Sequence, residues 1–256
     1  MKTIELYRQI QDFRFLSFNL PIRKALAFSR IVLASYLILA SLISPVNAAT
    51  SHDPLEKVNR VTYGFNRIVD GLLFKPAAKA YGKITPVLVK KGVRNFFYNL
   101  DDVRVIFNEL MQLKIVAAAS DMRRLAVNST FGIGGIIDVA GPVLKLEKHN
   151  EDFGQTLAFW NVGAGPYLVL PFFGPSTLRD SSSLFVDSLV HPIPQTDHID
   201  TRNTLLTGNV IDSREAILGF DGLVSGDDYL FVRVWYLQYR EYLNNDGNLE
   251  ISFVDF

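Results

Sequence analysis

The spacing of apolar residues beyond residue 53 most constrains the fold of this chain. Between residues 55 and 72, apolar side chains recur every three or four positions, which places them on one face of an α-helix. The same period indicates further helices over residues 85–100, 103–113, 115–130, 176–190, 201–206, 213–224 and 228–244. The sequence therefore predicts an all-α domain of amphipathic helices with short connections.

Local signals mark where several of these helices begin. Asp53-Pro54-Leu55-Glu56 matches a capping box with Asp53 as N-cap, and Thr85-Pro86 repeats the cap and the proline. Adjacent carboxylates on a helix point about 100° apart, so the pairs Asp101-Asp102 and Asp227-Asp228 are expected to cap helices rather than act together. The stretch from Asn99 to Asp102 predicts a break between two helices.

Glycine and proline interrupt the helical pattern between residues 132 and 175. Because glycine adopts left-handed backbone conformations and proline cannot continue a helix, short elements and turns are expected there. Residues 167–170 are too few to assign, and residues 191–194 predict a rigid connection. The interrupting residues are Gly132, Gly134, Gly135, Gly141, Gly154, Gly163, Gly165, Gly174, Pro142, Pro166, Pro171 and Pro175.

Residues 1–48 read as a secretory signal peptide. Arg23, Lys24 and Arg30 precede the apolar run 31–43, whose length of about 13 residues falls short of the ~20 that span a bilayer. Small residues then predict cleavage between Ala48 and Ala49, which leaves residues 49–256 as one helical domain. The alternative is an uncleaved membrane tether.

Charge and hydropathy limit the kinds of molecule that this protein is expected to contact. The chain carries 26 basic and 26 acidic residues, and no Lys/Arg-rich run follows residue 60, which argues against nucleic acid. Hydrophobic residues make up 48% of the chain and 19 are Phe, so part of the fold is expected to contact lipid. No segment after residue 48 reaches ~18 uncharged apolar residues, and no transmembrane helix is predicted there.

Motifs for catalysis and cofactor binding are missing from the sequence. The absence of cysteine excludes disulfides and thiolate chemistry, and Gly82-Lys83 lacks the rest of a P-loop. Ser176 lies outside a Gly-x-Ser-x-Gly elbow and is expected to cap a helix. No histidine has a ligand partner at helical spacing, so no metal site is predicted. We expect neither an enzyme nor a bound cofactor. The histidines are His52, His149, His191 and His198.

Three stretches of sequence are more specific than composition. They are residues 128–141, a helix end running into a glycine cluster closed by Asp138; residues 153–157 with 163–180; and residues 53–56 with 59–60 and 63–66. Together they resemble the MlaA (VacJ) family of outer-membrane phospholipid-transport proteins. The resemblance covers about residues 53–243, nearly all of the chain beyond the signal peptide.

This resemblance implies a ring-shaped, all-helical protein at the periplasmic face of the outer membrane, beside trimeric porins. Phospholipids misplaced in the outer leaflet would pass through a central channel to a soluble periplasmic carrier and an inner-membrane ABC transporter. A path with a polar lining lowers the free-energy barrier for moving a headgroup across hydrocarbon, and it does so without an energy source. The alternatives are a periplasmic interaction or scaffold protein without a lipid channel and, less favoured, a secreted lipid-acting enzyme.

The resemblance also suggests residues for the lipid path, although each has a structural alternative. The glycine cluster could admit close backbone approach or form a turn, and charged residues could meet headgroups or one another. Phe65, Phe96, Phe97, Phe172 and Phe173 could face lipid or the core, and Arg233, Tyr236 and Arg240 could face headgroups or water. The candidate set is Phe65, Asn66, Gly132, Gly134, Gly135, Asp138, Gly163, Gly165, Pro166, Tyr167, Pro171, Gly174, Arg179, Asp180 and Arg233.

One feature departs from the family pattern. Members typically carry acyl chains on a cysteine after the signal peptide, whereas this chain has Ala48-Ala49-Thr50 there and no cysteine. Attachment through the apolar surface, a porin contact or a retained signal segment is expected instead.

Overall fold

The computed structural model describes residues 53–222 and 226–248. The expected signal peptide and the Ala48–Ala49 junction lie outside these residues. Within the described part, the structure is mostly helical, which confirms the predicted class, and it adds one short β-hairpin.

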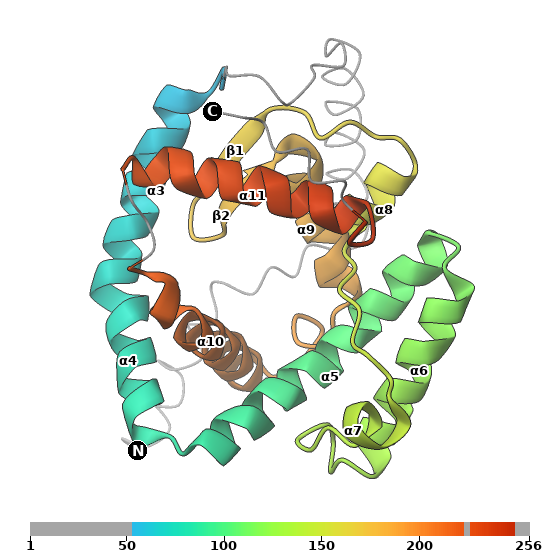
Figure 1. The fold of residues 1–256 in the computed structure, drawn as a ribbon. Helices are drawn as coiled ribbons and strands as arrows, with labels where there is room; N and C mark the ends of the chain where they lie inside the picture. The colour runs from blue at the N-terminus through green and yellow to red at the C-terminus, as the bar shows by residue number, and fades with distance from the viewer. Residues whose placement is uncertain (1–52, 223–225, 249–256) are drawn as a thin grey trace, which may run out of the picture. The chain divides into compact units, whose positions relative to one another are not determined.

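The first helices form one continuous stretch. Helix α3 (Glu56–Val69) passes into the π-helical turn η1 (Asp70–Phe74) and then α4 (Lys75–Ile84), as Figure 1 shows. The predicted N-cap role of Asp53 is wrong, because the helix begins at Glu56 with Leu55 in the cap position. The Asp53 carboxylate is buried and accepts hydrogen bonds from Asn59 Nδ2 (3.1 Å) and the Tyr229 hydroxyl.

Helices α5 (Val87–Met111) and α6 (Ile115–Thr130) form a hairpin. The range of α6 matches its prediction, but the break predicted at Asn99 to Asp102 is wrong, since α5 runs straight through it. Asn99 donates to Ser129 Oγ (3.0 Å), and the Asp102 carboxylate lies 2.9 Å from Arg124 Nη1. These partners on α6 stabilise polar residues that disfavour a helix interior in isolation. Asp101 and Asp102 therefore do not cap a helix.

Short elements follow, as the glycines and prolines predict. Helices α7 (Ala140–Leu144) and α8 (Phe153–Phe159) precede strands β1 (Tyr167–Leu170) and β2 (Gly174–Thr177). The strands pair antiparallel with Tyr167 opposite Thr177 and Leu170 opposite Gly174. The sequence did not predict this hairpin, because four residues carry too little periodicity.

The C-terminal helices differ from prediction in two places. Helix α9 (Leu178–Val190) is capped by Thr177, whose hydroxyl accepts from Asp180 N, so the cap predicted at Ser176 is off by one residue. A single helix α10 (Ile199–Ala216), followed by the 3₁₀ turn η2 (Leu218–Phe220), replaces the two helices predicted over 201–224. Ion pairs from Asp212 and Glu215 to α5 hold its C-terminal turns. Helix α11 (Asp228–Asn244) is capped by Asp227 as predicted.

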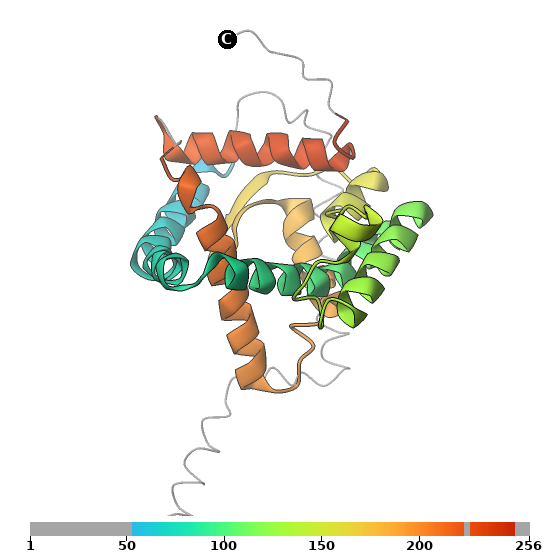
Figure 2. The ribbon, with the colours of Figure 1, turned by 60° about the horizontal axis from the view of Figure 1, so that its bottom comes forward.

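The elements of this unit lie around a ring in Figure 1: α3 and α4 on one side, α5 along the next, α8 and α9 beyond it, and α11 spanning the remaining side from α3 to α8. In Figure 2, the β-hairpin lies between α11 and α5. Helix α10 packs against α4 and α5, and α11 packs against α8 and β2.

Polar side chains dominate the interior of this unit. Among the described residues, 21 buried residues are polar or charged and only 10 are hydrophobic, so polar contacts hold most of the interior together. On α6 the buried residues Ala118, Asp121, Arg124 and Asn128 follow the helical period. Met122, which the sequence placed inside, is 44% exposed. In the part of the chain that the structure describes, no helix is both long and apolar enough to span a bilayer.

Substitution of Gly132 by alanine tests the close packing of the glycine cluster. A Cβ at Gly132 would lie 2.1 Å from the Ile137 carbonyl oxygen and 2.4 Å from that of Asn128, and both are backbone atoms that cannot rotate away. We expect Gly132→Ala to lower the free energy of unfolding by about 3 kcal/mol. Denaturant unfolding in detergent, followed by circular dichroism, measures the loss.

Gly163→Ala is the matched control, because a Cβ there meets no atom within 4 Å. It should change stability by less than about 0.5 kcal/mol. Equal stability of the two variants would contradict the assigned geometry.

Candidate functional site

Large apolar side chains are exposed along α3, η1, α4 and the start of α5. Their exposed fractions lie between 62% and 83%. Exposed apolar surface of this extent marks a site of contact with lipid, another protein or a ligand. We call this set the apolar face: Val61, Ile68, Leu72, Leu73, Ile84, Val87 and Leu88.

The turn of the β-hairpin lies beside α3. The rings of Phe65 and Phe172 meet edge to face with centroids 5.2 Å apart, and Phe172 and Phe173 are 65% and 74% exposed. Of the predicted lipid-facing aromatics, these three are at the surface. Phe97 is buried and packs against the half-buried Phe96, so Phe97 belongs to the interior.

Two asparagines on α3 hold strand β1 and the turn. Asn59 donates to the Tyr167 carbonyl and accepts from Val169 N, both at 2.9 Å. Asn66, seven residues later on the same face of the helix, donates to the Leu170 carbonyl and accepts from Phe172 N, both at 2.8 Å. The two amides thus occupy the strand edge that no second strand covers and fix the exposed turn against α3. Asn66 is therefore a positioning residue.

Tyr167 lies in the small apolar core beside Val169 and Tyr229. The Arg233 guanidinium lies 5.9 Å from the centre of the Tyr167 ring, an arrangement in which a cation is attracted to the aromatic face. Burial raises the pKa of Asp53, but hydrogen bonds from Tyr229 and Asn59 outweigh it and hold that pKa below its ordinary value. Arg233 adds a favourable charge to the buried carboxylate.

Arg179 and Asp180 form a buried ion pair, the structural alternative for these two residues. Arg179 Nε lies 2.9 Å from Asp180 Oδ1. Arg240 on α11 reaches the same carboxylate through Nη2 (3.2 Å) and also pairs with Asp152, while the Tyr236 hydroxyl donates to Asp180 Oδ2 (2.9 Å). The network joins α8, α9 and α11. The prediction that Arg240 could face water is wrong, because it is 8% exposed.

Gly154 makes room for this network. A Cβ there would lie 2.6 Å from Asp180 Oδ1 and 2.8 Å from Arg240 Nη2. Burial raises the pKa of Asp152, but hydrogen bonding and attraction from Arg240 outweigh it, so the pKa lies below the ordinary 3.8 and Asp152 is ionised at neutral pH. Asp152, Gly154 and Arg240 were missing from the candidate set because their partners lie far along the chain.

The cluster of residues 132–141 is a folded connection. Gly134 and Gly135 have φ of +67° and +88°, and a Cβ on Gly135 would lie 2.4 Å from Asn99 Cβ. Asp138 Oδ1 accepts from Asn128 Nδ2 (3.0 Å) and Gly141 N (3.1 Å), which fixes the start of α7. The backbone of this cluster therefore packs closely against its neighbours, and the hydrogen bonds of Asp138 stabilise the connection.

A cavity of about 420 Å³ lies beside Asp138. Cations and carboxylates both line it, so it suits a ligand that carries charges of both signs. Its lining includes Tyr98, Arg124, Asp138, Lys145, Glu147 and Lys148.

The remaining candidates shape the backbone around the hairpin. Gly165 has φ of +68°, and the carbonyls of Ala164 and Pro166 accept hydrogen bonds from Arg179 N and Leu178 N. Gly174 (φ +81°) closes the turn that contains Pro171. Gly163 makes no close approach. These residues set the hairpin on α9, and none presents a side chain with chemical function.

Three residues from separate segments meet at the α5–α6 hairpin. His149 Nδ1 lies 2.9 Å from Asp121 Oδ2 and 3.3 Å from Glu109 Oε1. The prediction that His149 is isolated is therefore wrong; spacing along the chain could not show the contact. Burial and repulsion from Asp121 raise the pKa of Glu109 to about 8. No residue of the candidate set belongs to this group.

Comparison with known proteins shows the relatives of the chain. The family model described as MlaA lipoprotein matches residues 51–243. The intermembrane phospholipid transport system lipoprotein MlaA of Escherichia coli (strain K12) is 34% identical over 234 residues, which cover 88% of this chain and 91% of that protein. The protein of the same name from Shigella flexneri is also 34% identical, with the same coverage.

A solved structure gives the corresponding match in three dimensions. It comes from work on the structural basis for maintenance of bacterial outer membrane lipid asymmetry and is 32% identical to this chain. The TM-score is 0.68, and the match covers 76% of this chain and 100% of the other.

Removal of Arg240 tests the buried network. Arg240→Met keeps side-chain length but leaves the carboxylates of Asp152 and Asp180 without their shared cation. Breaking a buried pair in this way costs about 3–5 kcal/mol, and we expect the free energy of unfolding to fall by that amount. Denaturant unfolding in detergent provides the measurement.

Arg67→Met serves as the comparison, because the Arg67 side chain is 69% exposed where it pairs with Asp228. Its loss should cost less than about 1 kcal/mol. If both variants lost the same small amount, the network would not hold α11 to α8 and α9.

Proposed function

The chain belongs to the MlaA family of lipoproteins, and on this premise we propose that it takes part in phospholipid transport between membranes and thereby maintains lipid asymmetry of the outer membrane. Transport here means that the protein provides a path for lipid and makes or breaks no covalent bond.

One observation carries the proposal: the helices turn polar residues inward and apolar residues outward. On α3 the sole buried residue is Asn59, at 2% exposure, whereas Val61 is 74% exposed. In water this arrangement would be costly, because burying a Val, Leu or Ile side chain is worth about 1.5–3 kcal/mol. In lipid the cost disappears, since the surrounding acyl chains are as apolar as the side chains.

The apolar face also bears on attachment to the membrane. Its seven side chains would together favour a lipid environment by roughly 10 kcal/mol. A single acyl chain gives only marginal, reversible binding. We therefore place the described domain at the periplasmic face of the outer membrane, held by this face even though the chain contains no cysteine to acylate.

The transport step follows from the same distribution. A phospholipid headgroup that enters hydrocarbon loses hydration, which costs several kcal/mol, and a path that offers charged and hydrogen-bonding groups lowers this barrier. The exposed Lys145 of the cavity offers a cation for the phosphate, and the exposed Glu147 offers an anion for an amine. The proposed movement is passive, so lipid flows down its own gradient.

The partners of the protein follow from the family. We propose that it lies beside a trimeric porin and delivers phospholipid to a soluble periplasmic carrier, which serves an inner-membrane ABC transporter. The second candidate function is a periplasmic scaffold protein without its own lipid path. The exposed apolar face favours the first.

A deletion strain tests the proposal. Phospholipid should accumulate in the outer leaflet when the gene is removed, and a plasmid copy of the wild-type gene should reverse the accumulation. Leu72→Glu places a charge on the apolar face, so it should complement poorly. Surface-exposed phospholipid is quantified after labelling of intact cells.

Gln238→Glu provides the matched control, because it adds the same charge at an exposed polar position of α11, and it should complement fully. No accumulation after deletion, combined with release of the protein in the soluble periplasmic fraction, would overturn the transport proposal and support the scaffold function.

A further inference from the structure

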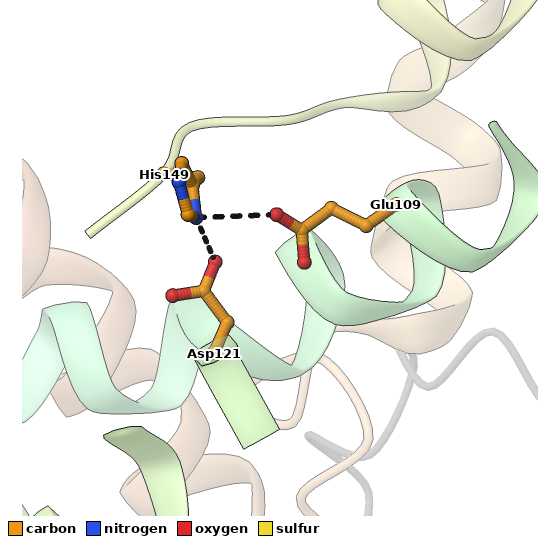
Figure 3. A group of neighbouring side chains, drawn as sticks. All are labelled: Glu109, Asp121 and His149. Atoms are coloured by element: carbon orange, nitrogen blue, oxygen red, sulfur yellow. Dashed lines mark hydrogen bonds and ion pairs between the residues drawn. The ribbon is translucent and has the colours of Figure 1, made fainter. Parts of the chain in front are cut away.

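A group of titratable side chains contains no residue of the apolar face and none that lines the cavity beside Asp138. Glu109 projects from α5, Asp121 from α6 and His149 from the connection between α7 and α8, and Figure 3 shows the three pointing toward one another. One ligand atom from each lies within 4.8 Å of the other two. The elements thus bring a nitrogen and two carboxylate oxygens to one point.

Both carboxylates are buried without adequate partners. Glu109 and Asp121 are each 0% exposed, and among the described residues both Glu109 oxygens and Asp121 Oδ1 accept no hydrogen bond. Buried carboxyl groups in this condition are costly, and a bound cation would satisfy the oxygens of both. The unpartnered oxygens are an observation independent of the clustering itself.

Neighbouring charged residues do not supply the missing partners of these carboxyl oxygens. Lys114 acts on Glu109, but its ammonium already pairs with Glu151 (2.8 Å) and with Asp246. Glu151 adds a further negative charge near Glu109. The His149 side chain is 44% exposed and approaches only one oxygen of each carboxyl group, which leaves Glu109 Oε2 and Asp121 Oδ1 without a partner in the described part of the chain.

We propose that Glu109, Asp121 and His149 bind one divalent transition-metal ion, for which Zn²⁺ is the best match. Zinc takes imidazole nitrogen and carboxylate oxygen at about 2.0–2.2 Å, so ligand atoms of a tetrahedral site lie roughly 3.4 Å apart. The contacts of 2.9 and 3.3 Å from His149 Nδ1 are close to that spacing.

The charge and the donor set agree with this ion. Two carboxylates and a neutral imidazole balance the charge of Zn²⁺, and the exposed side of His149 leaves a fourth position for water. Ca²⁺ and Mg²⁺ are less suitable, because both prefer oxygen ligands in larger number. The ion would link the connection between α7 and α8 to the α5–α6 hairpin and stabilise their contact. This role is independent of lipid transport.

Metal analysis of the full chain tests this proposal. Protein purified in detergent is stripped with a chelator and then titrated with ZnCl₂ and, separately, MgCl₂ by isothermal calorimetry. We expect one Zn²⁺ per chain and no Mg²⁺ binding. Glu109→Gln, Asp121→Asn and His149→Gln should each weaken Zn²⁺ binding at least about 100-fold, since even groups that only orient a ligand contribute 10–100-fold.

His198→Gln is the matched control, because His198 is exposed at the start of α10, and it should bind Zn²⁺ like the parent chain. His149→Gln changes a partly exposed side chain in a connection, so it remains informative if a buried variant fails to fold. Absence of Zn²⁺ binding, or binding that these three substitutions leave unchanged, would overturn the proposal. The group would then be a buried polar contact between His149 and two acidic side chains only.

Discussion

Hydrogen bonds and ion pairs buried between the helices are the interactions on which the rest of this structure depends. Asp102 with Arg124 joins α5 to α6, and Arg240 joins α11 to α8 and α9. Because these contacts occupy the interior, they allow the helices to present their apolar sides outward. The charged groups tolerate burial because they are paired. Removal of one partner leaves the other charge buried and unpaired, which lowers the stability of the fold.

This arrangement links stability to function. A protein that turns its apolar side chains outward suits lipid, while most of its buried polar groups are paired internally, as hydrocarbon requires, with Glu109 and Asp121 as exceptions among the described residues. The asparagines of α3 are a further example of internal hydrogen bonding. Asn59 and Asn66 bond to backbone groups of the hairpin and hold its exposed phenylalanines in place at the turn. The proposed membrane contact and the internal hydrogen bonding thus both follow from one distribution of residues.

Helix type and several boundaries could be predicted from the sequence, whereas partners across the fold could not. The periodicity of residues 115–130 gave α6 correctly, but the break predicted at Asn99 to Asp102 failed because α6 supplies the partners that keep α5 helical there. In the candidate set, Phe65 is exposed and the glycine cluster is closely packed, each of which was one of the alternatives drawn from the sequence. Arg240 and the Glu109 group were not predictable, since their contacts join residues distant in sequence.

If the apolar face contacts acyl chains, a label placed on it should be reached by lipid rather than by water. A chain without cysteine permits single labelling sites, so Val61→Cys, Leu88→Cys and Gln238→Cys can each carry an environment-sensitive fluorophore in proteoliposomes. The account predicts that nitroxide-labelled lipids quench the label at 61 and 88 while aqueous iodide quenches the label at 238. Equal quenching by iodide at all three positions would contradict it.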